Sequence, residues 1–131
     1  ESKAIVDVRV STREDARWVE AAIRNLEATT TGTRLDIEGA IDRDPMEATP
    51  ANKVLWEAVR GCGRRLGLDL VGAQSGGASD GNTTSLYTAT IDGLGPVGDG
   101  AHALHEYVEI SRLVERTTLL ALILMLPPLK D

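Results

Sequence analysis

Apolar and polar residues alternate over the first ten positions, and one side of the pattern is formed by Ala4, Val6, Val8 and Val10. A period of two predicts a half-buried strand with one polar face, on which Asp7 and Arg9 lie. A weaker alternation around Leu35 and Ile37 predicts a second strand. Short apolar runs at residues 68–71 and 88–92 predict two more strands.

Three longer segments repeat their apolar residues at helical spacing, over residues 11–26, 49–66 and 111–126. Ser11 and Glu14 have the spacing of a capping box at the start of the first helix. Thr49 and Pro50 suit the cap and first position of the second, and Gly67 suits its end. In the third helix the residues predicted to face a core are Leu113, Val114, Leu120, Ala121 and Leu124.

The order of these elements predicts two parts. One helix with two strands, before an irregular polar link at residues 39–49, is too little to close a core of its own. After the link, helix, strand, helix, strand and helix follow one another, which is the α/β pattern of a layered sheet. The predicted class is therefore α/β, preceded by half of an α+β sandwich.

Composition narrows the classes of function. The length of 131 residues suits about one domain, and the net charge of −6 argues against a nucleic-acid partner. A single cysteine, Cys62, cannot form an internal disulfide, and the apolar run near the end is too short to span a bilayer. We expect a soluble, cytoplasmic protein that binds neither nucleic acid nor membrane.

Glycine is concentrated between residues 76 and 110, in GGASDGN and then in IDGLGPVGDGAHALHEYVEI. Such density lets the backbone turn tightly and approach a ligand closely. The GGASD start predicts a loop that enters a helix, where free N–H groups can bind an anion. A segment that only forms a core does not need this composition, so the stretch is predicted to be a site.

These motifs resemble the C-terminal part of the co-catalytic di-zinc exopeptidases. That family includes glutamate carboxypeptidase, acetylornithine deacetylase, succinyl-diaminopimelate desuccinylase and the aminoacylases. The motifs are most similar to those of the glutamate-carboxypeptidase-like branch. Upstream, AIVDVRVSTREDARWVEAAI resembles the family's VDVR strand and following helix, and DRDPME resembles its Arg-Pro-containing turn. The resemblance implies that residues 1–42 are the C-terminal half of an α+β (ferredoxin-like) lid or dimerisation domain. Residues 43–131 would be the C-terminal half of the zinc-exopeptidase-like α/β/α catalytic domain.

The resemblance also implies an activity, the hydrolysis of an amide bond beside a free carboxylate in an acyl-amino acid or peptide. A complete active site would hold two zinc ions, or cobalt in their place. The family's other metal ligands and its general base lie in the N-terminal half, so we expect no catalytic residue in this chain and no activity from it alone. The expected partners are that missing half, the small substrate and a second copy in a homodimer.

Three groups of residues carry the implied site. His102 matches the histidine that closes the second zinc site; the alternative is a surface or capping histidine, and His105 is interpreted as a bystander. Arg43 matches the arginine that clamps the substrate carboxylate; the alternative is a loop arginine paired with Asp42 or Asp44. Backbone N–H groups of the loop would bind the same carboxylate, and this loop comprises Gly76, Gly77, Ala78 and Ser79. The alternative for the loop is a tight turn into a helix.

One further function remains open at this stage. The absence of a full ligand set also suits a non-catalytic, truncated chain that acts only in pairing or dimerisation. An unrelated small binding domain would require the long motif match to be accidental.

Overall fold

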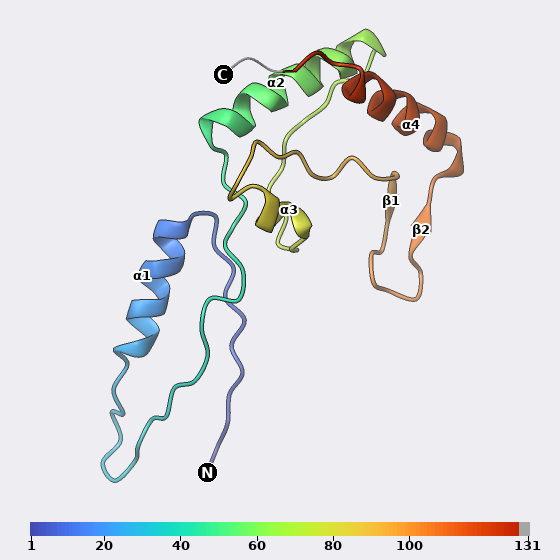
Figure 1. Cartoon of the computed structure of the whole chain (residues 1–131). Coiled ribbons are helices and arrows are strands. Elements are labelled where there is room, and N and C mark those ends of the chain that lie inside the picture. The colour runs from blue at the N-terminus through green and yellow to red at the C-terminus, as the bar shows by residue number, and fades with distance from the viewer. Residues whose placement is uncertain (129–131) are drawn as a thin grey trace. The chain divides into compact units, whose positions relative to one another are not determined.

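The computed structural model describes residues 1–128, which form four helices and one two-stranded sheet. In chain order the elements are α1 (Arg13–Arg24), α2 (Pro50–Arg65), α3 (Asp80–Thr84), β1 (Gly98–Asp99), β2 (Tyr107–Val108) and α4 (Ile110–Leu124) (Figure 1). Residues 129–131, the end of the predicted catalytic half, lie outside the described part. None of the helices described is long and apolar enough to cross a membrane.

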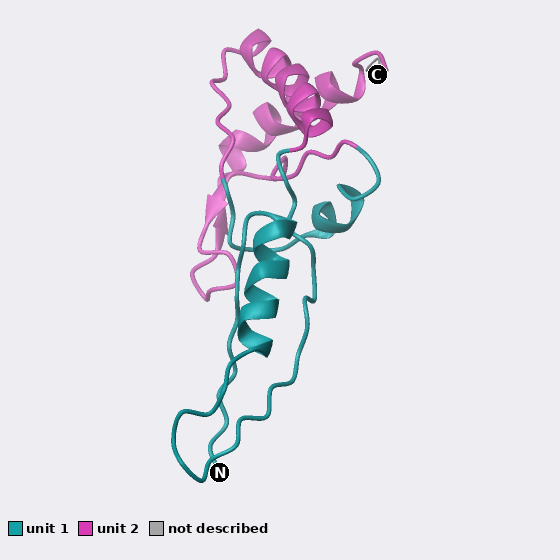
Figure 2. Ribbon diagram, turned by 90° about the vertical axis from the view of Figure 1, so that its left-hand side faces the viewer, with its two compact units in different colours: residues 1–48, 74–88 teal, residues 49–73, 89–131 magenta. Residues whose placement is uncertain are grey.

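The chain forms two compact units (Figure 2). The first combines residues 1–48 with residues 74–88, and so contains α1 and α3. The second combines residues 49–73 with residues 89 onward, and contains α2, the small sheet and α4. The glycine-rich GGASDGN loop thus belongs to the unit of the N-terminal segment. The sequence predicts a boundary between two family domains at residues 42 and 43. The compact units do not test that boundary, so it stays a prediction.

The three long helices form where the apolar spacing predicted them. The N-cap of α1 lies one residue later than predicted, because Thr12 rather than Ser11 accepts the N–H of Asp15 at 3.0 Å. α2 is capped by Thr49, with Pro50 at its first position as predicted. Gly67 follows its end with a φ of +72°, a conformation that glycine adopts without a steric penalty.

The predicted strands are wrong for this structure. Residues 4–10, 35–38, 68–71 and 88–92 form neither helix nor strand, and the predicted layered sheet is not formed in residues 1–128. A strand exists only when its N–H and C=O groups bond to a neighbouring strand. These segments find no such neighbour, and Ile5 remains 90% exposed. The only described pairing is antiparallel, between β1 and β2.

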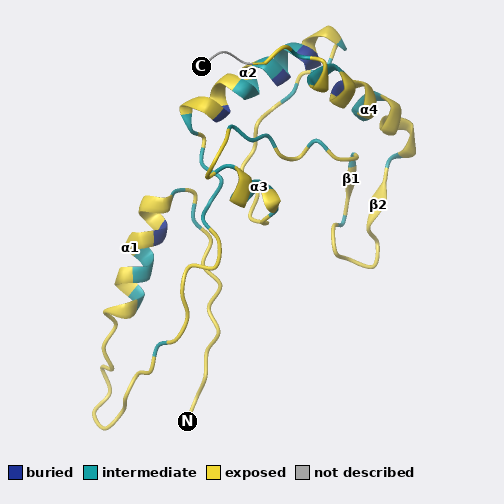
Figure 3. Cartoon of the chain, viewed as in Figure 1, coloured by how far each residue is buried: buried dark blue, intermediate teal, exposed yellow. Residues whose placement is uncertain are grey.

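Few side chains are buried in residues 1–128 (Figure 3). They are aliphatic apart from one thiol and one amide. The second unit buries Val59 and Cys62 of α2 together with Leu119 of α4. Cys62 was predicted to be buried, and it is. The predicted inward face of α4 is wrong, because Val114 and Leu124 are exposed and Leu119 is buried instead. α4 packs against α2 without a sheet beneath it, so a different face is covered.

Candidate functional site

The loop of residues 76–79 leads directly into α3, as its sequence predicts. Ser79 caps the helix, and its hydroxyl accepts the N–H of Gly81 at 3.0 Å. The side chain of Asn82 closes a capping box, since its Oδ1 accepts the N–H of Ser79 at 2.9 Å. The N–H of Gly77 donates to Ser75 Oγ at 3.1 Å. Within residues 1–128, two of the loop's four N–H groups, those of Gly76 and Ala78, make no hydrogen bond.

The same asparagine joins this loop to the turn that contains Arg43. Asn82 Nδ2 donates to the carbonyl oxygen of Asp44 at 2.9 Å, across 38 positions of the chain. Arg43 itself lies at a bend, is exposed, and makes no ion pair with Asp42 or Asp44 within the described residues. The structure therefore brings the two predicted carboxylate-binding segments together, inside one unit.

A second arginine lies against the loop. A Cβ added at Gly76 would stand 3.1 Å from Nη1 of Arg9, so glycine allows this approach. Arg9 also pairs with Asp7 at 2.9 Å, and both side chains are largely exposed. The sequence pattern placed Arg9 on the polar face of a predicted strand, which could be solvated or line a cleft or dimer seam, and it assigned Asn82 no role. An asparagine three residues after a capping serine is a signal that could have indicated a role for Asn82.

His102 lies in the other unit, in the turn that joins β1 to β2. Its φ is +67°, which makes it the one residue other than glycine with a positive φ in the described chain. The turn is closed by the bond from Ala103 N to Gly100 O at 2.8 Å, and His102 N donates to Glu106 Oε2 at 3.3 Å. The left-handed conformation is tolerated by histidine more readily than by most residues, and it presents the exposed side chain at the tip of the hairpin.

The residues present do not complete a zinc site. A zinc ion in a protein takes three or four ligands from His, Cys, Asp and Glu. In residues 1–128, no group of three or more such side chains is arranged to hold a metal ion. The imidazole of His102 is a suitable single ligand, while His105 packs its ring over Gly100. The role of His102 as a metal ligand therefore stays a prediction.

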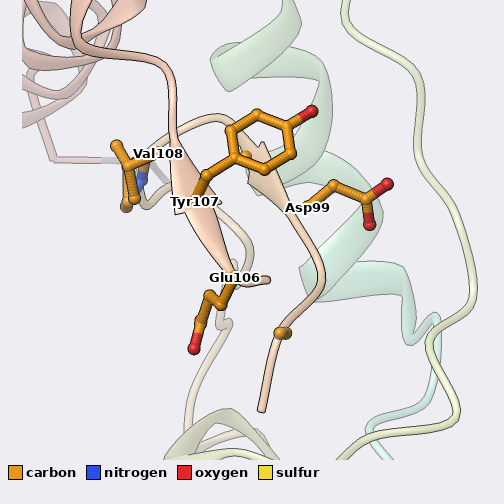
Figure 4. Close-up of a pocket in the computed structure, with 7 residues that line it drawn as sticks. Asp99, Glu106, Tyr107 and Val108 are labelled. Atoms are coloured by element: carbon orange, nitrogen blue, oxygen red, sulfur yellow. The ribbon is translucent and has the colours of Figure 1, made fainter. Parts of the chain in front are cut away.

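The hairpin bears a shallow depression of about 230 Å³, lined by Pro96, Gly98, Asp99, Ala101, Glu106, Tyr107 and Val108. Figure 4 shows Asp99 and the ring of Tyr107 on one side of the hairpin, while the carboxylate of Glu106 points away from both. The volume is below the roughly 300 Å³ at which small-molecule pockets begin. His102 does not line it. The depression is not the predicted site.

Comparison with protein families decides the affiliation. The model of peptidase family M20/M25/M40 matches residues 3–126, which is nearly the whole chain. The chain belongs to this family. Comparisons with curated proteins and with solved structures give no match. Family M20 is typically metal-dependent, in agreement with the predicted metallopeptidase and hydrolase class.

In this M20 domain the hairpin that contains His102 is anchored at its base by α4. Arg116 donates through Nε to Gly95 O at 3.0 Å and through Nη2 to Gly93 O at 2.9 Å. The planar guanidinium suits two such parallel bonds. Just beyond, Glu109 N donates to Val97 O at 2.8 Å. Arg116 thus holds the glycine-rich segment where it enters β1.

Replacing Arg116 by methionine should weaken the attachment of the hairpin to α4. The aliphatic part of the side chain is retained, but both hydrogen bonds are lost, at a cost of about 1 kcal/mol in local stability. We expect roughly fivefold faster hydrogen exchange at the amide of Glu109. The control is Arg112→Met, one turn earlier, where the guanidinium bonds only to the half-buried side chain of Glu115. Equal exchange in the two variants would show that Arg116 does not anchor the hairpin.

Proposed function

We propose that this chain is the C-terminal part of a zinc-dependent exopeptidase or amidohydrolase of the glutamate-carboxypeptidase-like kind. The enzyme hydrolyses an amide bond next to a free carboxylate. This chain binds that carboxylate and supplies one metal ligand. It is inactive without the N-terminal half of the enzyme, which provides the catalytic base and the remaining ligands. Membership of the M20 family supports the reaction class.

The observation that carries the proposal is the hydrogen bond from Asn82 to Asp44. It joins the Arg43 turn to the loop of residues 76–79 at a donor–acceptor distance of 2.9 Å. The guanidinium of Arg43 is exposed and donates two parallel hydrogen bonds to a carboxylate. The loop adds the N–H groups of Gly76 and Ala78, and the backbone of Gly77 and Ser79 shapes it. Together these donors suit a small anionic group of an acyl-amino acid or peptide.

His102 is proposed as a ligand of one of two zinc ions, with cobalt as a substitute metal. Its position at an exposed hairpin tip leaves the imidazole accessible to a metal held partly by another polypeptide segment. The unsatisfied requirement for further ligands is the reason why the N-terminal half is a necessary partner. No ligand role is proposed for His105.

Exposed apolar residues support a pairing role for the first unit. Ile5 and Val6 are 90% and 74% exposed, and Leu35 is also exposed. Burial of such side chains is worth about 1.5–3 kcal/mol each. We propose that the first unit, half of a lid and dimerisation domain, buries them against its other half and in a homodimer. The same observation supports the alternative, in which a truncated chain acts only in pairing.

Carboxylate recognition separates the two proposals. The probes are N-acetyl-L-alanine and N-acetyl-L-alaninamide, which differ only in the carboxylate. Each is titrated into the full chain, and binding is followed by NMR. We expect the chain to prefer the acid, and Arg43→Ala to lower the affinity for the acid roughly 10- to 100-fold. Arg43→Lys should recover only part of that loss, because a lysine lacks the planar fork.

The matched control is Arg34→Ala. Arg34 is an exposed arginine of the same unit, paired with Asp36 at 2.7 Å and assigned to no site. Its removal should leave the preference unchanged. A wild-type chain that binds the acid and the amide equally would overturn the proposed carboxylate site and leave the pairing role.

A further inference from the structure

We propose that Asn82 is a positioning residue that holds Arg43 and the loop of residues 76–79 at the separation one carboxylate requires. The inference rests on the proposed function of those two segments. It adds a residue that contacts neither the substrate nor a metal, and that acts through the geometry of the groups that do.

Both the oxygen and the nitrogen of the Asn82 side-chain amide make hydrogen bonds. Its Oδ1 accepts the N–H of Ser79 at 2.9 Å, and its Nδ2 donates to the carbonyl of Asp44 at 2.9 Å. The backbone N–H of Asn82 also donates to Ser79 O at 3.2 Å. Asn82 and Asp44 are both half-buried, so these bonds are partly shielded from water.

The two anchored atoms lie beside the proposed donors. The carbonyl of Asp44 is one residue from Arg43, and the N–H of Ser79 is the last of the loop. Charge-assisted bonds to a carboxylate operate over about 2.7–2.9 Å, so a shift of the turn by 1 Å would break simultaneous contact. A single planar side chain between the segments restrains that shift.

The chemistry of the asparagine suggests a selective substitution. Aspartate at this position keeps the acceptor for Ser79 N–H but loses the donor to Asp44, and it turns a carboxylate oxygen toward a carbonyl oxygen. Asn82→Asp therefore retains the cap and breaks the bridge. Asn82→Ala breaks both without adding charge. Thr83→Asp, on the next and exposed residue, adds the same charge and leaves the bridge intact.

The test measures the affinity of the full-chain variants for N-acetyl-L-alanine and N-acetyl-L-alaninamide. We expect both Asn82 variants to lose about tenfold in affinity for the acid and little for the amide, whereas Thr83→Asp should lose less than about threefold. A merely structural effect would lower both affinities together and leave the preference for the acid unchanged. Protection of the Ser79 amide from exchange reports whether the cap of α3 persists in Asn82→Asp. If that variant does not fold, Asn82→Ala decides alone.

The outcomes separate the two levels of the proposal. A wild-type chain that prefers the acid, with the same preference in Asn82→Asp, Asn82→Ala and Thr83→Asp, overturns the role of Asn82 and leaves the carboxylate site standing. A wild-type chain without any preference overturns the carboxylate site, and the role of Asn82 with it.

Discussion

Replacing His102 by alanine in the complete enzyme should lower bound zinc from roughly two ions per active site to roughly one. The reason is that an exposed imidazole at the tip of the β1–β2 hairpin is the metal ligand that this chain is proposed to supply. Loss of a residue that only supports a metal ligand costs 10- to 100-fold in affinity or activity. Loss of the ligand itself should therefore reduce hydrolysis by about 100-fold or more. Zinc is measured by elemental analysis on the same sample whose polypeptides are weighed by denaturing mass spectrometry.

His105→Ala is the matched control, because it removes the chain's other histidine from the same turn. We expect this variant to retain its zinc. Loss of zinc in both variants would assign the effect to the shape of the turn, and unchanged zinc in His102→Ala would remove His102 from the site. A wild-type sample that holds only a 14.0 kDa polypeptide and no stoichiometric zinc would contradict the metal-dependent function.

Replacing Leu119 by alanine should destabilise the second unit by about 3 kcal/mol. Leu119 is 1% exposed and is the largest side chain that the described residues bury completely. Its removal leaves a cavity where α4 packs against α2, in the small core that also buries Val59 and Cys62. Unfolding in urea, followed by circular dichroism, gives the difference in free energy.

Leu124→Ala makes the same chemical change on the same helix. Because Leu124 is 77% exposed, we expect a change within about 0.5 kcal/mol. Equal losses in the two variants would mean that α4 is not buried on its Leu119 face.

The helices could be predicted because their signals are local. The caps at Thr49 and Ser79 and the end at Gly67 depend on bonds within one turn of the chain. The strands could not be predicted in the same way. The alternation at residues 4–10 marks a segment able to pair, but pairing requires a neighbour that the pattern does not contain. The β1–β2 hairpin, by contrast, forms without having been predicted, because its two-residue strands are too short to give a periodic signal.

For the site, the sequence alone determined the family and the residue types that the chemistry needs. Motifs of specific order around Arg43, Gly76 and His102 indicated a metallopeptidase family, and the match over residues 3–126 shows membership of peptidase family M20/M25/M40. The tertiary structure alone decided which of these residues are neighbours. Asn82 contacts Asp44 because folding brings together segments 38 positions apart, and no local pattern specifies that distance. Likewise, the burial of Leu119 depends on which face of α4 packs against α2. The spacing of apolar residues along α4 is compatible with burial of several faces.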